Sequence, residues 1–324
     1  MVQAVRIHEY GGPDVLRYEA VDVPAPAAGE VRLKQTACGL NYIDTYQRSG
    51  AYKLAALPAV LGMEGAGEVI ALGPDVSGLK VGDRVAYAMS PGGYAQERNV
   101  LAAKVVKVPA GIDDATAAAM MLQGMTVRYL FCETYPVTAK TVMLFHAAAG
   151  GVGLIACQWA KALGATLIAT VGSDEKAALA KAHGATHVIN TRSEDFAARV
   201  KEITGGKGCD VVYDSIGKDT FPASLDCLKP KGLWVSFGSA SGPVPPFDLA
   251  ILAGKGSLFA TRPTLATYIA RREDLEANTA ELFEMVTSGK VKINVNQRYR
   301  LSEAAQAHRD LEARKTTGST VLMP

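Results

Sequence analysis

A glycine-rich segment between a strand pattern and a helix pattern constrains this chain more than any other part of it. The segment reads Ala147-Ala148-Ala149-Gly150-Gly151-Val152-Gly153 and follows the apolar run 142–146. A pyrophosphate binds backbone N–H groups at a helix N-terminus only where no side chain holds it away, and glycine meets that need. The segment therefore predicts a dinucleotide-binding turn at Gly150, Gly151 and Val152, although Ala148 replaces the first glycine of the G-x-G-x-x-G pattern. The alternative is a plain tight turn.

After residue 140 the chain repeats a unit of one apolar run followed by one helical segment. Strands are predicted over residues 142–146, 166–171, 187–190, 210–213 and 233–237, and helices over residues 153–163, 175–183 and 196–204. Strands that are apolar on both faces and joined by helical crossovers form a parallel sheet with helices on both sides. We therefore expect an α/β fold containing a doubly wound parallel sheet, the Rossmann domain.

The first part of the chain has short strand-like runs, separated by glycine and proline. These runs cover residues 2–7, 31–36, 65–72 and 84–88, and they predict a compact antiparallel barrel or sandwich. At the other end we expect a helix over residues 268–288, a second helix from about Ser302 and a strand over residues 319–323. Because these last elements are too few for their own core, the expected domains are residues 1–122 with 263–324, and residues 123–262.

Composition and charge exclude several classes of protein. The 324 residues are 48% hydrophobic and 20% charged, with 34 Lys and Arg against 32 Asp and Glu. Such a chain can bury a large core, and it offers no global field to nucleic acid or to an anionic membrane. No apolar run is long enough to span a bilayer, and charged residues interrupt the first ten positions. We expect a cytoplasmic protein without membrane or nucleic-acid partners.

The five cysteines are Cys38, Cys132, Cys157, Cys209 and Cys227. Their number is odd and no two of them stand close together, which argues against a disulfide framework and against a Cys-x-x-Cys metal site. We expect them to be buried and to act as small hydrophobic residues.

The end of the second strand of the Rossmann domain bears on the choice between NAD and NADP. An NAD site normally has a carboxylate at this tip for the adenosine ribose, but Gly172 and Ser173 stand here. Ser173 can donate to a phosphate, while Lys176 and Arg192 can supply positive charge. The set favours NADPH. The alternative is that Asp174 binds the ribose and that Lys176 is an ordinary solvated lysine.

Four motifs spread over the whole chain carry a family resemblance. They are Gly39-Leu40-Asn41-Tyr42-Ile43-Asp44, Gly62-Met63-Glu64-Gly65-Ala66-Gly67, Val81-Gly82-Asp83-Arg84-Val85, and Ala148-Ala149-Gly150-Gly151-Val152-Gly153 with Gln158 and Lys161 following. Together they resemble the medium-chain dehydrogenase/reductase superfamily, in particular its zinc-independent quinone oxidoreductase branch, to which ζ-crystallin belongs. The resemblance implies a GroES-like, β-rich catalytic domain in addition to the Rossmann domain, with NADPH as cofactor and a homodimeric assembly.

The zinc-dependent members of that superfamily hold their metal with residues that this chain lacks. They have a cysteine three positions before the aspartate matching Asp44, and a histidine before the glutamate matching Glu64. Asn41 and Met63 stand there instead, and amides and thioethers are poor zinc ligands. We expect no metal. The resemblance then implies hydride transfer to a quinone or, alternatively, to the carbon–carbon double bond of an alkenal or enone, since both need little activation.

The resemblance also names the candidate site residues. Asn41, Tyr46 and Tyr52 are the candidate catalytic residues, unless Asn41 only caps a turn and the tyrosines are surface aromatics. Further cofactor contacts are expected at Tyr42, Ile43, Tyr46, Thr126, Gly172, Ser215, Phe237, Gly238, Ser239, Arg262 and Arg314. Close relatives often have a tyrosine by the adenosine phosphate where this chain has Thr191, so Arg192 is expected to contribute more. A third hypothesis, a non-catalytic NADPH-binding or RNA-binding protein, is disfavoured by the balanced charge.

The run Ser257-Leu258-Phe259-Ala260-Thr261 predicts how the chain assembles. It follows Pro243, Pro245 and Pro246, and it contains neither charge nor proline. A β-prone run at the edge of a sheet offers unpaired backbone groups to another chain, and a two-fold axis satisfies both edges at once. We therefore expect a homodimer with sheets continuous across the interface, the alternative being an edge that the chain's own loop covers.

Overall fold

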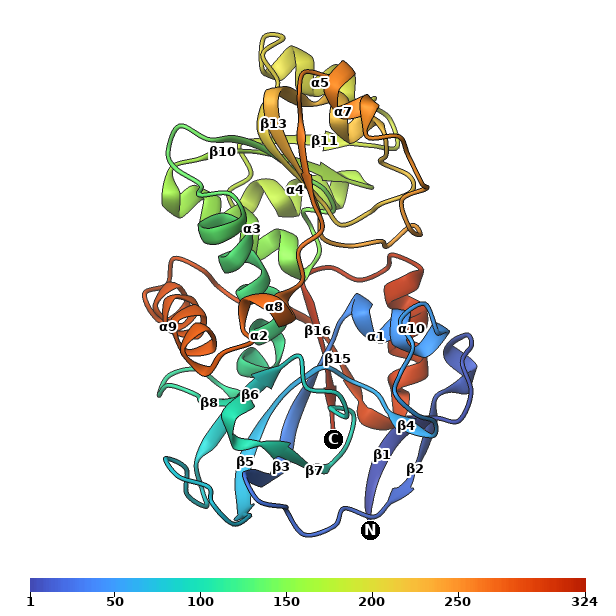
Figure 1. The fold of residues 1–324 in the computed structure, drawn as a ribbon, viewed down its shortest axis with the longest axis vertical. Helices are drawn as coiled ribbons and strands as arrows, with labels where there is room; N and C mark the ends of the chain where they lie inside the picture. The colour runs from blue at the N-terminus through green and yellow to red at the C-terminus, as the bar shows by residue number, and fades with distance from the viewer. The chain divides into compact units, whose positions relative to one another are not determined.

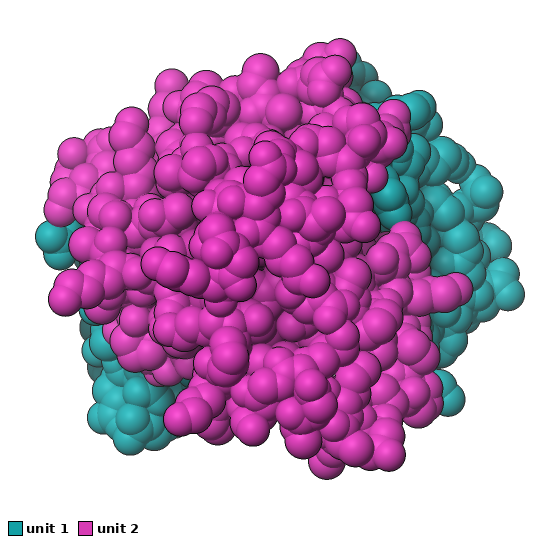
Figure 2. Space-filling view, turned by 90° about the horizontal axis from the view of Figure 1, so that it is seen from above, with its two compact units in different colours: residues 1–125, 268–287, 293–324 teal, residues 126–267, 288–292 magenta.

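The computed structural model describes all 324 residues, which form two compact units (Figures 1 and 2). Unit 1 contains residues 1–125, 268–287 and 293–324, and unit 2 contains residues 126–267 and 288–292. The N-terminal and C-terminal segments therefore share unit 1. The domain limits expected from the sequence differ from these bounds by a few residues and stay a prediction. None of the helices combines the length and the apolar character needed to cross a membrane.

Unit 2 is built on a six-stranded parallel sheet with the strand order β11-β10-β9-β12-β13-β14. The strands are β9 (Val142–Phe145), β10 (Thr166–Val171), β11 (His187–Asn190), β12 (Cys209–Asp214), β13 (Leu228–Ser236) and β14 (Phe259–Thr261). The order reverses between β9 and β12, and at such a switch point the carboxyl ends of the strands open a crevice for a ligand. The expected doubly wound parallel sheet is confirmed.

Five helices and one π-helical turn complete unit 2 (Figure 1). They are α3 (Gly151–Leu163), α4 (Asp174–Ala182), α5 (Phe196–Ile203), α6 (Ala223–Asp226), α7 (Ala250–Gly254) and the turn Leu130–Thr134. Leu144, Ile168 and Val212, on three adjacent strands, are completely buried in one apolar cluster with residues of α5 and α7. Because helices pack on the sheet, its strands are apolar rather than alternating, which is the pattern that identified them in the sequence.

Unit 1 contains two sheets, one of three strands and one of seven. Their orders are β2-β1-β4 and β15-β16-β3-β5-β6-β8, with β7 paired to β3. The strands are β1 (Val2–Ile7), β2 (Arg17–Val21), β3 (Glu30–Leu40), β4 (Ala59–Val60), β5 (Glu64–Leu72), β6 (Arg84–Ala88), β7 (Glu97–Leu101), β8 (Val105–Lys107), β15 (Val295–Arg300) and β16 (Ser319–Met323). Every pair is antiparallel except β15 with β16. Since β16 pairs with β3, the end of the chain completes a sheet that begins near its start.

The remaining helices, of which α2 and α8 continue across the sequence limits of the two units, correct one expectation. They are α1 (Tyr42–Ser49), α2 (Asp114–Tyr129), α8 (Leu265–Tyr268), α9 (Arg272–Thr287) and α10 (Ala304–Glu312), with short 3-10 turns at Pro13–Val15, Ala102–Lys104 and Leu301–Glu303. The first 122 residues are not purely strand-like, because α1 and most of α2 lie there. Apolar residues occur all around α2, so the sequence has no amphipathic pattern from which this helix could be predicted. The helix expected over residues 268–288 is confirmed as α9, which begins four residues later than expected, and the short helix α8 precedes it. Cys132 is exposed, against expectation, whereas the other four cysteines are buried.

Candidate functional site

The glycine-rich turn joins β9 to α3 through a constrained backbone. Ala147 adopts the left-handed conformation with φ 55°, which a residue bearing a Cβ rarely adopts. Its carbonyl oxygen accepts the N–H of Gly150 at 3.0 Å, which closes the turn. Gly150 is the N-cap of α3 and is itself in extended backbone. The chain thus turns sharply from the strand into the helix within four residues of sequence.

Glycine is required in this turn so that α3 can pack closely against it and so that a ligand can reach the backbone N–H groups. A Cβ on Gly153 would lie 2.5 Å from the Cα of Ala148, so the helix and the turn approach more closely than any side chain allows. The N–H groups of the first helical turn have no intrahelical partner. Those of Gly151 and Val152 follow the glycine N-cap, so no side chain at Gly150 or Gly151 stands before them. This arrangement fits the pyrophosphate of a dinucleotide.

A buried carboxylate ties together the strand ends next to this turn. Asp214 ends β12 and is completely buried. Its oxygens accept the N–H groups of Ile216 (2.9 Å) and Gly217 (3.1 Å), the hydroxyls of Thr220 (2.8 Å) and Ser224 (2.9 Å), and the indole N–H of Trp234 (3.3 Å). Burial raises the pKa of Asp214, but the charge of His146 and these hydrogen bonds together outweigh burial and keep the pKa below its usual range. Asp214 therefore stays ionised.

His146 extends this network to the neighbouring strand. It precedes the glycine-rich turn and is 1% exposed, with Nε2 3.0 Å from Ser224 Oγ and Nδ1 2.9 Å from Thr170 Oγ1. The hydroxyl of Ser224 donates its one hydrogen to Asp214, so Nε2 of His146 donates to Ser224 and Nδ1 accepts from Thr170. Burial lowers the pKa of His146, which favours the neutral ring. The network thus fixes the carboxyl ends of β9, β10 and β12. Sequence analysis missed it because its members share no motif.

The tip of β10 carries the residues expected to choose between the two dinucleotides. Ser173 caps α4, its Oγ accepting the N–H of Lys176 at 3.3 Å. Its hydroxyl also contacts the carboxylate of Glu175, and this hydrogen bond, together with the charge of Arg192, lowers the pKa of Glu175. Arg192 is exposed. The structure therefore brings Ser173 and Arg192 to one acidic side chain, Glu175, which the sequence analysis did not single out.

Asp174 does not stand free at this tip. Its Oδ1 accepts the side-chain N–H of Asn190, at the end of β11, at 2.8 Å. This engagement counts against the alternative in which Asp174 binds the ribose. Thr191, at the position where close relatives have a tyrosine, donates from Oγ1 to the carbonyl of Val171 at 3.1 Å and thereby joins the ends of β10 and β11.

The remaining candidates of unit 2 lie mostly where strands end. Ser215 follows β12, residues 237–239 follow β13, and Arg262 follows β14. A Cβ on Gly238 would lie 2.6 Å from the carbonyl oxygen of Ser215, so these two segments are in close contact. Arg262 donates from Nη1 to the carbonyl of Ser236 at 2.8 Å. Phe237 packs on Phe145 of β9, with ring centroids 5.7 Å apart, and Ser239 lies two residues further along. Thr126 differs from this group, since it is buried within α2.

Asn41 of unit 1 joins β3 to α1. Its backbone N–H and its side-chain amide bind different partners. Its backbone N–H donates to Oδ2 of Asp44 at 2.8 Å, which fixes the start of α1. Its side-chain amide does not cap the helix. Instead Nδ2 donates to Oε2 of Glu64 at 2.6 Å, and Oδ1 accepts from Nε2 of Gln123 at 3.1 Å. Asn41 is 6% exposed, so the amide is held on both sides in a nearly closed environment.

Glu64, the first residue of β5, is completely buried without a cation beside it. Its Oε1 accepts the backbone N–H of Leu122 at 2.7 Å. Burial raises the pKa of Glu64 to about 8, although the hydrogen bonds from Asn41 and Leu122 act in the opposite direction. A Cβ on Gly39 would lie 2.4 Å from Oε2, so glycine at this position makes room for the carboxylate. The sequence analysis used Glu64 only to align a motif. Its apolar neighbours in the sequence could have predicted that its carboxylate is buried.

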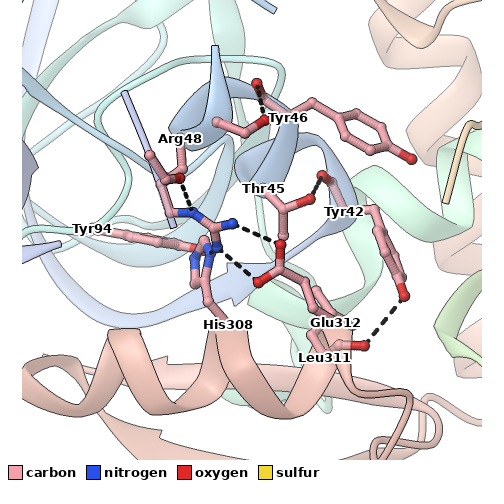
Figure 3. A network of polar contacts seen from close by, with 10 residues as sticks. Tyr42, Thr45, Tyr46, Arg48, Tyr94, His308, Leu311 and Glu312 are labelled. Carbon is pink, nitrogen blue, oxygen red and sulfur yellow. Dashed lines mark hydrogen bonds and ion pairs between the residues drawn. The ribbon is translucent and has the colours of Figure 1, made fainter. Parts of the chain in front are cut away.

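Helix α1, which bears two of the candidate tyrosines, is anchored by the buried Arg48 (Figure 3). Arg48 is 3% exposed, and its Nη1 and Nη2 donate to the two carboxylate oxygens of Glu312 at 3.1 and 2.6 Å. Nη1 also lies 2.9 Å from Nδ1 of His308. Burial lowers the pKa of His308 to about 3, and Arg48 acts in the same direction. Tyr42 donates from its hydroxyl to the carbonyl of Leu311 at 3.2 Å. Arg48 and Tyr42 thus fasten α1 to α10 through contacts with three of its residues.

The three tyrosines lie together. The rings of Tyr46 and Tyr52 meet edge to face with centroids 5.2 Å apart, and those of Tyr42 and Tyr46 are 6.3 Å apart. The backbone N–H of Tyr52 donates to the carbonyl of Tyr46 at 3.0 Å. Burial raises the pKa of Tyr42, and the charge of Arg314 opposes that effect, which places Arg314 near the group. Ile43 is half-buried in the same helix.

The residues at the metal-ligand positions of zinc-dependent relatives do not form a metal site. No group of three or more His, Cys, Asp or Glu side chains is arranged to hold an ion. Asn41 turns its Nδ2 donor toward Glu64, and the sulfur of Met63 accepts Nε2 of Gln47 at 3.2 Å. Both side chains are therefore engaged in hydrogen bonds that a metal would have to break. Independence from a metal stays a prediction.

A doubly wound sheet with a glycine-rich turn at its switch point defines a dinucleotide-binding oxidoreductase, and comparison with known proteins agrees. Residues 27–110 match the alcohol dehydrogenase GroES-like domain, and residues 151–284 match the zinc-binding dehydrogenase family. A quinone oxidoreductase from Pseudomonas aeruginosa is 55% identical over the whole of both chains. The crystal structure of Escherichia coli quinone oxidoreductase complexed with NADPH is 50% identical and has a TM-score of 0.98, covering 99% of this chain and 100% of that one.

A 2-haloacrylate reductase from a Burkholderia species is 46% identical, covering 100% of this chain and 99% of its own. The chain therefore belongs to the medium-chain dehydrogenase/reductase superfamily, and to its quinone oxidoreductase branch, as the four motifs implied. The GroES-like and Rossmann domains expected from that resemblance are confirmed.

Proposed function

We propose that this chain transfers a hydride from NADPH to a quinone without a metal ion. Its family and its similarity to a protein solved with NADPH make it an NADPH-dependent oxidoreductase. The observation that carries the rest of the proposal is the Asn41–Glu64 hydrogen bond of 2.6 Å. It stands where zinc-dependent relatives place a ligand, and it supports an acceptor that needs no strong Lewis acid.

The residues of unit 2 bind and orient the cofactor in this proposal. The N–H groups after Gly150 receive the pyrophosphate, while Lys176 and Arg192 receive the 2′-phosphate with Ser173 and Thr191 beside them. Glu175 competes for Ser173 and Arg192 until the phosphate displaces it. Ser215, residues 237–239, Arg262 and Thr126 complete the cofactor contacts.

The residues of unit 1 act on the acceptor. NADPH, when bound, supplies the hydride. The remaining N–H of the Asn41 amide can donate to an oxygen, since Glu64 uses one of its two hydrogens. Tyr46 and Tyr52 offer an aromatic surface and hydroxyl groups, while Tyr42, Ile43 and Arg314 are assigned to the cofactor. A quinone needs little more than positioning, because hydride addition restores an aromatic ring.

A second candidate is reduction of a carbon–carbon double bond conjugated to a carbonyl or carboxyl group. The 46% identity to a 2-haloacrylate reductase over the full chain specifically favours it. It uses the same cofactor and the same unit 2 residues. The two candidates differ in where the hydride arrives: on the quinone ring or on the β-carbon of the double bond.

A substrate panel with NADPH tests the proposal. Initial rates of NADPH oxidation are measured with 1,4-benzoquinone, a naphthoquinone, an alkenal and 2-chloroacrylate, each also with NADH. We expect kcat/KM for the quinones to exceed that for the double-bond substrates by about tenfold or more. The reverse order would establish the second candidate, and no NADPH oxidation with any acceptor would contradict both.

We also propose that the protein works in the cytoplasm as a homodimer. β14 is the edge strand of the unit 2 sheet, and its Phe259 is 61% exposed. Light scattering at micromolar concentration is expected to give about twice the chain mass of 34.1 kDa. Phe259→Pro, which removes a ladder donor, is expected to shift the protein toward monomer. A wild-type monomer would contradict the assembly.

A further inference from the structure

Four buried side chains of unit 1 form one hydrogen-bonded chain with a single direction. Ser319, at the start of β16, donates to Oε1 of Gln123 at 2.7 Å. Gln123 donates to Asn41, and Asn41 donates to Glu64, at 3.1 and 2.6 Å. The residues are at most 7% exposed. Every donor therefore faces toward Glu64, which accepts through both oxygens only when it is ionised.

The direction of this chain depends on Glu64, because its other contact cannot be reversed. Oε1 of Glu64 accepts the backbone N–H of Leu122, and a backbone N–H has no alternative orientation. The side-chain amides of Asn41 and Gln123, in contrast, exchange their donor and acceptor ends by turning over. Ser319 can donate or accept at the far end. The chain therefore has two hydrogen-bond patterns, and the group at position 64 selects between them.

We propose that Glu64 and Gln123 are positioning residues that set which end of the Asn41 amide, N–H or C=O, faces each side of its site. The inference rests on the proposed function in so far as Asn41 contacts the acceptor, whereas the orientation itself depends on unit 1 alone. Glu64 held as a carboxylate keeps Nδ2 of Asn41 on its own side. A donor in place of that carboxylate reverses Asn41 and then Gln123.

Protonation of Glu64 produces this reversal in the wild type. The acid then donates to Oδ1 of Asn41, Nδ2 donates to Oε1 of Gln123, and Nε2 donates to Oγ of Ser319, so of this chain only the Ser319 hydroxyl hydrogen loses its acceptor. The titratable groups that interact with Glu64 are Asp44 of α1, Tyr87 of β6 and Tyr94, which precedes β7. Helix α2 contributes the Leu122 N–H and the Gln123 amide, and β16 contributes the Ser319 hydroxyl.

The sharpest test moves the carboxylate from one end of the chain to the other. In Glu64→Gln/Gln123→Glu the side-chain volumes, net charge and number of hydrogen bonds are retained. The new glutamine must turn its oxygen to the Leu122 N–H, so its nitrogen donates to Oδ1 of Asn41. The new glutamate accepts from Asn41 and from Ser319. The double variant is therefore expected to fold like the wild type with the Asn41 amide reversed.

Two measurements follow the orientation. In uniformly deuterated protein with ¹⁵N-labelled Asn and Gln, the side-chain signal of Asn41 is assigned by its loss in Asn41→Asp. We expect that signal to shift in the double variant, and in the wild type to move toward the same position as the pH falls below 8. For quinone reduction above pH 8, where Glu64 of the wild type is ionised, kcat is expected to be roughly 10- to 100-fold lower in the double variant, while the Kd for NADPH changes less than about threefold.

Glu64→Gln alone is the second variant, and it is expected to give the reversed signal at every pH. Glu97→Gln on β7 is the matched control for loss of one carboxylate, and both the signal and the rate are expected to stay as in the wild type. An Asn41 signal unchanged in Glu64→Gln and in the double variant overturns the inference. A reversed signal with an unchanged rate supports the positioning and contradicts the role of Asn41 in the proposed function, so the two failures are distinguishable.

Discussion

Each unit of this protein buries one carboxylate completely, and the two carboxylates differ in how many fixed donors surround them. Asp214 in unit 2 accepts hydrogen bonds from five residues, two of them through backbone N–H groups. Glu64 in unit 1 accepts from three residues, namely from the backbone of Leu122 and Met121 and from the side-chain amide of Asn41, which can turn over. The pKa of Asp214 is lowered, whereas burial raises that of Glu64 to about 8.

The comparison indicates that hydrogen-bond donors and a neighbouring positive charge can outweigh burial, and that they decide whether an internal carboxylate stays ionised. Asp214 is a fixed charge, suited to holding the strand ends beside the glycine-rich turn in one arrangement. Glu64 is an adjustable charge, and its state changes the surroundings of Asn41. A fixed charge suits the cofactor-binding site, because the pyrophosphate does not change during the reaction. A titratable charge can be used by a group near a reacting atom.

The largest effect is expected from Asp214→Asn, which turns one of the two accepting oxygens into a donor. The donors of Ser224 and Trp234, or those of Ile216 and Gly217, would then face another donor in the core. We expect a loss of about 3 to 5 kcal/mol in the free energy of unfolding, measured by urea denaturation. Asp22→Asn, at an exposed position, is the control and is expected to change it by less than about 0.5 kcal/mol. A loss of that small size for Asp214→Asn would remove the distinction between the two carboxylates.

The cofactor preference is expected to depend on the charges at the tip of β10 and β11 and not on unit 1. In Lys176→Ala and Arg192→Ala we expect the Kd for NADPH to rise about tenfold to a hundredfold in each variant, with little change for NADH. The physical reason is the loss of one charge-assisted contact with the 2′-phosphate. Fluorescence titration with both cofactors measures it. Equal Kd values for NADPH and NADH in the wild type would contradict the assignment.

The pH dependence of stability is expected to have opposite signs for the two carboxylates. Glu64 has a raised pKa in the folded state, so the folded state holds its proton more tightly and stability falls as the pH rises from about 4.5 to about 8. One such group contributes at most about 1.4 kcal/mol per pH unit. Asp214 has a lowered pKa, so its contribution is present above pH 3.8 and is lost as the pH falls below it.

The contributions of Glu64 and Asp214 are separated by measuring the free energy of unfolding of the wild type and of Glu64→Gln between pH 6 and 7.5. The variant cannot titrate at position 64, so we expect its free energy of unfolding to decline less over this interval, by about 2 kcal/mol. Asp44, whose pKa burial raises to about 7, titrates in both proteins and cancels in the difference. Parallel curves would show that Glu64 does not titrate in this range.

The sequence predicted the parts of this molecule that repeat a local rule. The strands of the parallel sheet were found because apolar runs recur between helical segments, and Gly153 was placed correctly because only glycine permits the close approach at Ala148. Helix α2 was missed because it is apolar all around. Helix α1 was missed because it is short and its only notable residues were the tyrosines and Asp44.

The two buried networks could not be predicted, since they join residues far apart in the sequence. Ser319 and Gln123 meet only because β16 pairs with β3. Neither local sequence indicates that the two residues are in contact. The same holds for His146, Ser224 and Asp214, which the ends of two strands and a short helix bring together. Single polar residues in apolar surroundings were the one available signal, and they do not reveal their partners.

Removal of metal is expected to have the smallest effect, namely none, and it tests whether an amide–carboxylate pair has replaced a metal in unit 1. Nδ2 of Asn41 lies 2.6 Å from Oε2 of Glu64, so this oxygen already accepts a hydrogen bond from an uncharged amide. Elemental analysis of the purified protein is expected to find well under one zinc per chain. Prolonged treatment with EDTA is expected to leave quinone reduction unchanged.

The matched control restores ligands at the two altered positions. In Asn41→Cys/Met63→His a thiolate and an imidazole stand beside Glu64, and we expect this variant to take up zinc while its quinone reduction becomes sensitive to EDTA. The wild type and the variant then differ in metal content although they share the same fold. Stoichiometric zinc in the wild type, or a rate that EDTA removes and zinc restores, would show that unit 1 holds a metal and that its buried carboxylate is not an adjustable charge at all.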